Sequence, residues 1–500
     1  MIETIKTVND TLNSLIWGWP ALALLGFTGV LMTCLTGFFQ VTHFRYWWKH
    51  TIGAIFNEEH ITKHTSDRTI SQFQSLCTAL AATVGTGNIV GVAGAIAVGG
   101  PGAVFWMILI AFFGMMTNYS ENVLGILYRR KNSEGEWCGG AMYYLRDGLG
   151  AKPGMKGVGT ALAVLFSVFC VIASFGIGNM SQVNSMVSNV YTAFGIPKLA
   201  TGVFLFIAVG AVIVGGLKRI AAFTERLVPF MVILYLAGAL IIVITHVTVI
   251  PAALVSIFKG AFAMKSALGG VVGAGIAQAM KMGMKRGVFS NEAGLGSSVM
   301  VHSSSNVREP VRQGMWGIFE VFADTVIVCT LTSLVILTSG AVDLQTGVLT
   351  AEAEAVGSSS LVSWAFSNQF GQLGAAFVAL AVLLFAYSTV LGWSHYGSKA
   401  FEYLFGTKSI MAYRVVFACI VLAGSVLEAK LAWDISDTFN GLMMLPNLIG
   451  VVVLSPQVRQ CTKNYVDRKI KGLDEEPFLS MFPDIQEIEE TELIEAGGED

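Results

Sequence analysis

The segment TVGTGNIVGVAG (residues 83–94) places four glycines, two threonines and Asn88 inside one of the most apolar stretches of the chain. Each glycine costs a helix interior about 1 kcal/mol relative to alanine, and unpaired polar groups in hydrocarbon cost more. A helix that unwinds in mid-membrane frees backbone N–H groups on one half and C=O groups on the other, which suit a carboxylate and a cation. The pattern therefore indicates a ligand site, with close helix packing as the alternative.

A second interrupted stretch follows at about residues 269–298. It contains GGVVGAGIAQAM (269–280), which we expect near mid-membrane, and SNEAGLG (290–296). The two interrupted spans lie five spans apart, so they must cross the membrane in opposite directions. Each leads through a short non-helical link into a strongly apolar helix. This arrangement predicts a five-plus-five inverted repeat behind one extra helix.

The composition is that of a polytopic membrane protein. Of 500 residues, 54% are hydrophobic and 13% are charged, whereas soluble domains carry about 25% charged residues. At roughly twenty apolar residues per crossing, an all-helical transporter domain of eleven transmembrane helices is predicted over residues 1–455, before an acidic tail over 456–500. The expected spans are 17–39 (the extra helix), 74–98, 102–128, 158–185, 199–217 and 226–248 (with 74–248 the first repeat), then 266–300, 312–340, 371–398, 410–428 and 433–454 (with 266–454 the second).

The distribution of basic residues predicts the orientation in the membrane. Five of the 31 Lys and Arg residues fall on one side of these spans and twenty-six on the other. By the positive-inside rule, the N-terminus lies outside and the C-terminus in the cytoplasm, in the plasma (inner) membrane. Glu121, near the inner end of the third span, is expected to pair with Arg129 or another base there. Residues 474–500 hold eleven acids and no base, which predicts a solvated, largely disordered end.

Several classes of function are disfavoured. The seven cysteines show no CxxC spacing, so neither a metal site nor a disulfide framework is indicated. No basic cluster carries the interleaved aromatics of a nucleic-acid surface. Convergent nucleophile and base groups, which an enzyme needs, are not evident. A channel would favour a continuously lined pore, whereas this chain shows one pair of symmetric breaks. We therefore expect a secondary transporter, without a cofactor or an obligate protein partner.

Three motifs in order and spacing carry a family resemblance. The segments GTGNIVGVA (85–93), GGPGAVFWMILIAFFG (99–114) and KRGVFSNEAGLGSS (285–298) resemble the alanine/glycine:cation symporters, the sodium:alanine symporter family, within a match over about 17–455. One departure is Ile108, where the family is expected to carry tryptophan; this apolar change concerns packing. The resemblance implies a LeuT-like inverted-repeat fold and import of alanine or glycine with sodium by alternating access.

The first interrupted span supplies one group of candidate site residues. Gly85, Thr86 and Gly87 can offer backbone amides to a substrate carboxylate, because glycine lets a ligand approach the main chain. Asn88 is similar in placement to an asparagine that holds sodium in related folds, and Thr83 is expected to join it as a sodium ligand. The alternative for Asn88 is a hydrogen bond that bridges two helices.

The second interrupted span supplies another group, with a glutamine to bind the polar end of the substrate and apolar side chains to bound a small methyl group. Glycine-rich packing is the alternative. The candidates are Gly273, Gly275, Ile276, Gln278 and Met280. Further along, Asn291 and Glu292 are expected to cap or gate the inner half-helix rather than to bind substrate directly.

Two other spans carry further candidates. Phe175 and Gln182 fall on one helical face, which suits an aromatic lid with an amide partner or, equally, a core stripe. Ser388 and Thr389 resemble a paired sodium ligand of this fold, although such hydroxyls often bond their own i−4 carbonyl. Trp393, one turn further along, is a candidate pocket wall.

Two acids lie well inside the eighth span. Glu320 and Asp324 are four residues apart, and intramembrane carboxylates are functional candidates by default. They either hold or guide the cation, or are satisfied by Lys281 or Lys285. The sequence thus predicts a sodium-coupled importer of small neutral amino acids, with proton coupling through Glu320 or Asp324 as the alternative. Since one methylene is worth only about 1–3 kcal/mol in a pocket, separation of glycine from alanine is expected to be imperfect.

Overall fold

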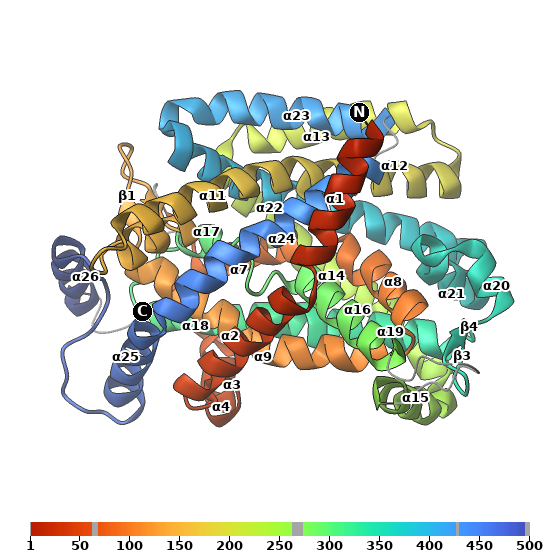
Figure 1. Ribbon diagram of the computed structural model, residues 1–500, viewed down its shortest axis with the longest axis horizontal. Coiled ribbons are helices and arrows are strands. Elements are labelled where there is room, and N and C mark those ends of the chain that lie inside the picture. Colours follow the sequence, from red (N-terminus) through yellow and green to blue (C-terminus); the bar gives the residue numbers. More distant parts are fainter. Residues whose placement is uncertain (1, 63–68, 263–273, 427–429, 496–500) are drawn as a thin grey trace.

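The computed structural model describes residues 2–62, 69–262, 274–426 and 430–495, and it is a bundle of helices that run between two end faces (Figure 1). We call one end the tail face. It carries α25 (Ser455–Tyr465), α26 (Pro483–Glu495) and the antiparallel hairpin β1–β2 (Arg130–Lys131, Trp137–Cys138). The opposite end, the far face, carries α15 (Ile250–Phe262), α20 (Ala351–Val356) and the antiparallel hairpin β3–β4 (Val342–Asp343, Val348–Leu349).

Seven helical segments in the described ranges are long and apolar enough to cross a membrane, or up to nine if each of two bent pairs is one span. They are formed by α1 (Ile2–Ile16) with α2 (Trp19–Leu35), α9 (Gly102–Leu127), α11 (Lys156–Phe175) with η3 (Gly176–Met180) and α12 (Ser181–Phe194), α14 (Gly216–Thr245), α18 (Pro310–Val321) with η5 (Phe322–Cys329) and α19 (Thr330–Thr338), α22 (Gln372–Phe405), and η7 (Thr407–Ser409) with α23 (Ile410–Val426). The all-helical, membrane-spanning class is confirmed. The count of eleven spans stays a prediction, because α13 (Lys198–Ile213) is shorter and the seventh predicted span lies partly outside the described residues.

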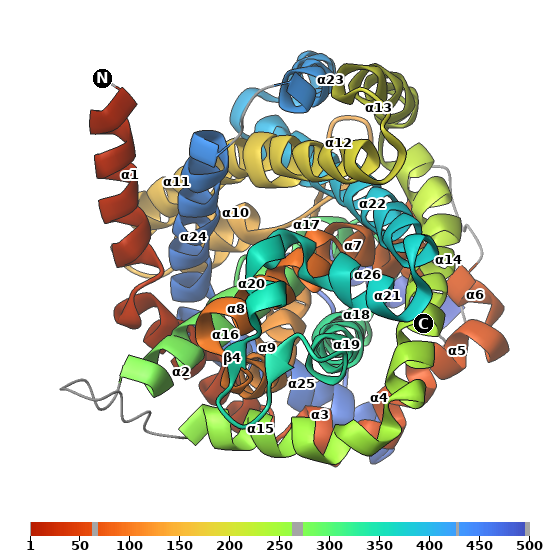
Figure 2. The same ribbon diagram turned by 90° about the vertical axis from the view of Figure 1, so that its right-hand side faces the viewer.

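Shorter elements connect these helices. They are α3 (Phe39–Thr42), α4 (Phe44–His50), α5 (Ile52–Asn57), α6 (Glu59–Thr62), α10 (Ala141–Tyr143), η2 (Tyr144–Leu149), η4 (Val247–Val249), η6 (Ser358–Ser360), α21 (Leu361–Phe370) and η8 (Val466–Ile470). Figure 2 views the bundle from the far face, with α13 and α23 at its rim and α7 (Gln72–Thr83) and α17 (Val299–His302) inside it. The helices α7 and α17 therefore lie in the interior, away from the rim.

The predicted break at residues 83–94 is present. A capping box formed by Ser71 and Gln74 starts α7, which ends at Thr83. After residues 84–86 the chain resumes as η1 (Gly87–Gly91) and α8 (Val92–Gly99), bent by 49° from α7. Two glycines within three residues, Gly85 and Gly87, make continuation of the helix unfavourable at this point.

The second break lies within the predicted stretch 269–298, but at its SNEAGLG end rather than over 274–280. Residues 269–273 lie outside the described residues, but α16 (Ala274–Asn291) is a continuous helix, so an interruption over 274–280 is wrong. The helix ends instead before Glu292, Gly294 and Gly296, which have positive φ angles of 56°, 93° and 73°. Left-handed backbone cannot continue a right-handed helix. The chain resumes at α17, which follows the SNEAGLG segment.

The acidic tail is ordered through residue 495, so the expectation of a largely disordered end is wrong for the described part. Residues 496–500 lie outside it. The amide of Met481 donates to the carbonyl of Leu127 at the end of α9 (3.0 Å), and Leu479 and Leu493 are buried. The tail thus packs on the bundle rather than projecting into solvent.

One buried asparagine ties four elements together. In α24 (Lys430–Val453), Asn447 donates to Glu121 of α9 and to the carbonyl of Gly294 in the second break (2.9 Å), and it accepts from the hydroxyl of Tyr144. The expected pairing of Glu121 with Arg129 is therefore wrong, since an amide satisfies the carboxyl group instead. Arg129 pairs with Glu489.

We expect Asn447→Ala to lower the melting temperature of the purified protein by several degrees. The substitution leaves buried partners without hydrogen bonds, at about 1–3 kcal/mol for each group. The matched control is Asn189→Ala, because Asn189 donates within α12, to the carbonyl of Ser185 (2.9 Å). Scanning fluorimetry in detergent measures both; equal melting temperatures for the two variants would contradict the assigned role.

Candidate functional site

A small central cavity lies where the first break meets α16 and α22. Its volume is about 10 Å³, roughly what one water molecule needs. The lining residues come from segments far apart in the sequence: Ala82, Thr83, Gly85, Thr86, Gly87, Ile177, Gln182, Phe289, Glu292, Thr389, Trp393 and Asn440.

The cavity gathers eight of the eighteen predicted site residues that the structure describes. The first break, the fourth span and the ninth span contribute predicted residues to the lining, and the second break contributes one more. They are Thr83, Gly85, Thr86, Gly87, Gln182, Thr389 and Trp393, with Glu292 from the second break. Four lining residues were missed. Ala82, Ile177 and Phe289 are ordinary apolar residues in the sequence, whereas the amide of Asn440 in an apolar helix was a usable signal.

Asn88 closes the first break with its side chain. Its Oδ1 accepts from the amide of Gly85 (2.8 Å), and its Nδ2 donates to Oδ1 of Asp324 (2.7 Å). The helix-bridging hydrogen bond, the alternative for this residue, is therefore present. The amide of Gly85 is occupied by Asn88, so Thr86 and Gly87, at the start of η1, are better placed to offer backbone N–H groups to an anion.

Thr389 of α22 lies directly against the first break. A Cβ built on Gly85 would collide with Oγ1 of Thr389, so these two residues are in close contact across the two helices. The hydroxyls of Thr389 and Ser388 both donate to the carbonyl of Phe385 (3.0 and 2.8 Å). The hydroxyl of Thr83 donates to the carbonyl of Ala79 (3.2 Å). Each hydroxyl oxygen keeps lone pairs for a cation.

The polar network around Asp324 joins three elements. Its Oδ2 accepts from Thr325 (2.9 Å), whose hydroxyl accepts from Asn291 at the end of α16 (3.0 Å). Asn88 contributes the first break to the same network. The prediction that Asn291 caps this region is consistent with its contacts, since its Oδ1 accepts from the amide of Ala293 (3.0 Å).

Glu320 belongs to a separate buried network. Its Oε2 lies 3.0 Å from Nε2 of His302 and accepts from Asn118 (3.3 Å). The alternative in which Lys285 satisfies the intramembrane acids is wrong, because Lys285 pairs with Asp437 (2.6 Å). Both acids are instead held by neutral or histidine partners.

Five predicted residues lie away from the cavity. Gln278 is exposed, and Gly275, Ile276 and Met280 are half-buried on the first turns of α16; none of these four is among the lining residues. The ring of Phe175 stacks on Tyr413, with centroids 5.2 Å apart, so it packs in the core rather than as a lid.

The chemistry of the lining suits a zwitterion and a hard cation. Within the part of the chain that the structure describes, no group of three or more His, Cys, Asp or Glu is placed to hold a metal ion. The donors at the cavity are hydroxyls, amides and backbone groups, with Glu292 as a carboxylate that accepts from Ser297 (2.5 Å). Neutral oxygens of this kind coordinate sodium in broken-helix transporters.

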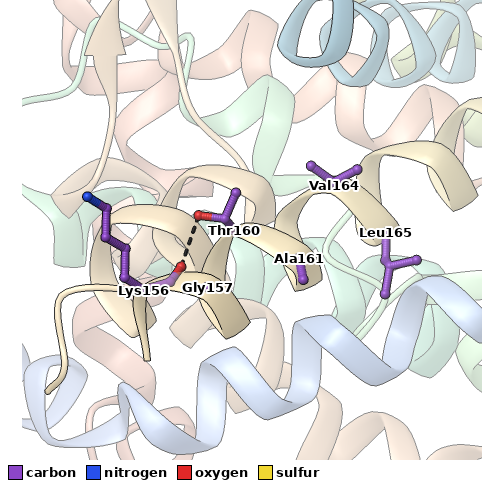
Figure 3. A pocket seen from close by; sticks show the side chains of 6 residues that line it. All are labelled: Lys156, Gly157, Thr160, Ala161, Val164 and Leu165. Atoms are coloured by element: carbon purple, nitrogen blue, oxygen red, sulfur yellow. Dashed lines mark hydrogen bonds between the residues drawn. The ribbon is translucent and has the colours of Figure 1, made fainter. Parts of the chain in front are cut away.

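A second hollow lies on the outside of α11. Figure 3 shows its lining, Lys156, Gly157, Thr160, Ala161, Val164 and Leu165, along one side of that helix. Its residues other than Lys156 and Thr160 carry no polar side-chain atom, and Thr160 bonds its own helix at the carbonyl of Lys156 (3.0 Å). This groove offers no convergent polar groups, whereas the central cavity does.

Comparison with known proteins gives the family. The model of the sodium:alanine symporter family matches residues 2–479. The sodium/alanine symporter AgcS of Methanococcus maripaludis is 42% identical over 470 residues, which cover 93% of this chain and 98% of the relative. The probable sodium/glutamine symporter GlnT of Bacillus subtilis is 34% identical, over 95% and 93% of the two chains.

Among solved structures, that of MhsT in complex with L-phenylalanine matches with a TM-score of 0.50 at 13% identity, over 80% of this chain and 99% of that one. At this identity the likeness concerns the fold, which is that of LeuT-fold transporters. The chain is an integral membrane transporter, not an enzyme, and it belongs to the sodium:alanine symporter family.

Proposed function

We propose that this protein imports small neutral amino acids, alanine and/or glycine, together with sodium by alternating access. The observation that carries the proposal is the small cavity at the first helix break, lined by Trp393, Ile177 and Phe289. The cavity has about the volume of one water molecule, so its walls must move apart to admit alanine, and a larger side chain demands a larger movement. The relatives named as sodium symporters are similar over nearly the whole chain.

In this proposal the substrate lies between the break and the surrounding amides. Its carboxylate accepts from the backbone amides of Thr86 and Gly87, at the positive end of the η1–α8 helix. Its ammonium group faces the carboxylate of Glu292 and the side-chain oxygen of Gln182, which already accepts from the hydroxyl of Thr86 (3.0 Å). Glycine at position 87 lets the ligand approach the main chain.

Sodium is proposed to bind beside the substrate, through the hydroxyl of Thr389 and the carbonyls that α7 leaves free at its end. Thr83, Asn88 and Ser388 are the further candidate ligands. The support is the close contact of Thr389 with Gly85, which puts a hydroxyl oxygen at the end of α7. Sodium is a co-transported substrate in this scheme, and no cofactor is needed.

The membrane arrangement completes the proposal. We infer eleven spans with a five-plus-five inverted repeat behind the extra helix, the N-terminus outside, and the tail face in the cytoplasm. The contact between α16 and the η1–α8 segment supports it, since the two interrupted elements of such a repeat meet at the centre.

A proton-coupled symporter of the same fold is the second candidate. It is favoured by one observation, the hydrogen bond of Asp324 to Asn88 (2.7 Å), which connects an intramembrane carboxyl group to the first break. Protonation of Asp324 would weaken its ability to accept from Asn88.

Uptake of labelled alanine into proteoliposomes, with sodium and proton gradients imposed separately, decides between these candidates. We expect an inward sodium gradient to drive accumulation, and excess glycine to compete far better than glutamine. Uptake that ignores sodium but follows an inward proton gradient would establish the second candidate. Strong competition by glutamine would contradict the size limit set by the cavity walls.

A further inference from the structure

Arg129, which follows the end of α9 on the tail face, is buried and fully engaged. Its guanidinium donates to the carbonyls of Ser305 (3.0 Å) and Val307 (2.5 Å) and to Oε1 of Glu489 (2.8 Å). It also lies 4.1 Å from the ring centre of Trp137. The side chains of Arg129 and Glu489 are 2% and 4% exposed, so this ion pair is excluded from water.

The two carbonyls that Arg129 holds belong to a segment that we call the gate connector, residues 303–309, between α17 and α18. The connector also pairs with Ile70, two residues before α7. The amide of Ile70 donates to the carbonyl of Ser304 (3.3 Å), and the amide of Asn306 donates to the carbonyl of Ile70 (2.9 Å). The connector therefore joins the tail-face ends of both interrupted elements.

The C-terminal tail also contacts the gate connector. Arg468 donates to both carboxylate oxygens of Glu309 (2.9 and 2.8 Å), the last residue of the connector. Phe482 lies under the guanidinium of Arg130 (3.8 Å), and α26 stands at this end of the bundle, as Figure 1 shows. The tail packs on the bundle and thereby places Glu489 beside Arg129.

We propose that Glu489 and Arg129 form a latch that holds the tail face closed, and that this latch must loosen before the central cavity opens toward α26. The inference rests on the proposed alternating access, which requires the tail-face ends of the interrupted elements to separate. Removing the carboxylate of Glu489 takes the charged partner of the buried Arg129 away, which is strongly unfavourable. When α26 moves away, Arg129 loses Glu489, and its hydrogen bonds to the carbonyls of the gate connector become weaker. Arg129 acts here as a positioning residue.

Hydrogen exchange of the purified full-length protein tests the latch directly. We expect Glu489→Gln to raise the exchange rate of the amides in residues 303–309 about tenfold, since one partner of a buried pair is lost and local opening becomes easier. The matched control is Glu487→Gln, which removes the same charge at an exposed position of the same helix. Equal exchange in the two variants and the wild type overturns the latch.

A native cysteine reports the tail itself. Cys461 is buried, and its Sγ lies 3.6 Å from the carbonyl of Phe478 in the tail. We expect maleimide to label Cys461 several-fold faster in Glu489→Gln than in Glu487→Gln, with the site assigned by mass spectrometry. Unchanged labelling means that Glu489 does not hold the tail. If Glu489→Gln does not fold, Glu489→Asp, which keeps the charge but shortens the reach, is measured in the same way.

A transport measurement separates a latch from a merely structural contact. Weakening the latch lowers the population that faces outward, so the external alanine concentration for half-maximal uptake is expected to rise several-fold. If the half-maximal alanine concentration is unchanged although the amides of residues 303–309 exchange faster, the latch has no role in the transport cycle. The exchange assay needs neither alanine nor sodium, so its result can be interpreted even if the proposed function is wrong. If the protein transports alanine with sodium but Glu489→Gln does not exchange faster, the latch is refuted and the proposed function is not.

Discussion

Gly85→Ala is expected to reduce sodium-driven alanine uptake about 100-fold, because small displacements at a binding site cost about that much. The added Cβ would collide with Oγ1 of Thr389 and lie 3.4 Å from its Cβ. The helix that carries Thr389 has little room to withdraw, since a Cβ on Gly392 of the same helix would already lie 2.7 Å from that of Ala82. The substitution must therefore deform the cavity at the point where substrate and sodium are proposed to meet.

Two glycines of the same segment provide matched controls. Cβ atoms built on Gly91 and Gly94 meet nothing within 4 Å, so Gly91→Ala and Gly94→Ala are expected to transport normally, in proteoliposomes with equal amounts of protein. Normal uptake by Gly85→Ala would show that the contact is irrelevant. Equal loss in all three variants would assign the effect to backbone flexibility instead of the cavity.

Asp324→Asn is expected to raise the sodium concentration for half-maximal uptake by at least about tenfold. Both carboxylate oxygens accept hydrogen bonds, from Asn88 and from Thr325. An asparagine must turn its NH2 group toward one of these donors, and an unsatisfied buried group costs about 1–3 kcal/mol, a factor of roughly 10 to 100. Asn88 then loses its anchor, and with it the geometry of the first break.

The control is Asp343→Asn, which removes the same charge in the β3–β4 hairpin of the far face, where Asp343 is exposed. It is expected to leave the sodium dependence unchanged. A wild-type sodium curve for Asp324→Asn would contradict the coupling of Asp324 to the cation. Loss of a proton-driven component in that variant, with sodium activation intact, would support the second candidate function.

The first break could be located from the sequence, whereas the second could be placed only within the broad stretch 269–298, for a physical reason. Glycine-rich sequence marks both turns and close helix contacts. In α16 the glycines serve contact: a Cβ on Gly287 would lie 3.0 Å from Ile110, and one on Gly283 would meet the backbone of Ala103. The true interruption, at Glu292, Gly294 and Gly296, is defined by positive φ angles, which composition does not reveal.

Phe175 illustrates a second limit. A regular helix places Phe175 and Gln182 on one face, but residues 176–180 form a π-helical turn, η3. Such a turn inserts one extra residue per hydrogen-bonded loop and rotates the faces that follow. Gln182 consequently reaches the cavity while Phe175 stacks on Tyr413.

The tail shows what composition omits. Eleven acids without a base in residues 474–500 predict a solvated chain, because local sequence offers no partner. The partners lie far away along the chain: Arg129 binds Glu489, and Arg308 binds Glu492. Long-range pairing of this kind becomes visible only when the fold brings the segments together.

The most direct measurement is a structure determined with alanine and sodium bound. We expect the carboxylate of alanine to lie within hydrogen-bond distance of the amides of Thr86 and Gly87, and sodium to lie beside the hydroxyl of Thr389. Alanine seated away from the first break, or a cation with no contact to α22, would contradict this expectation.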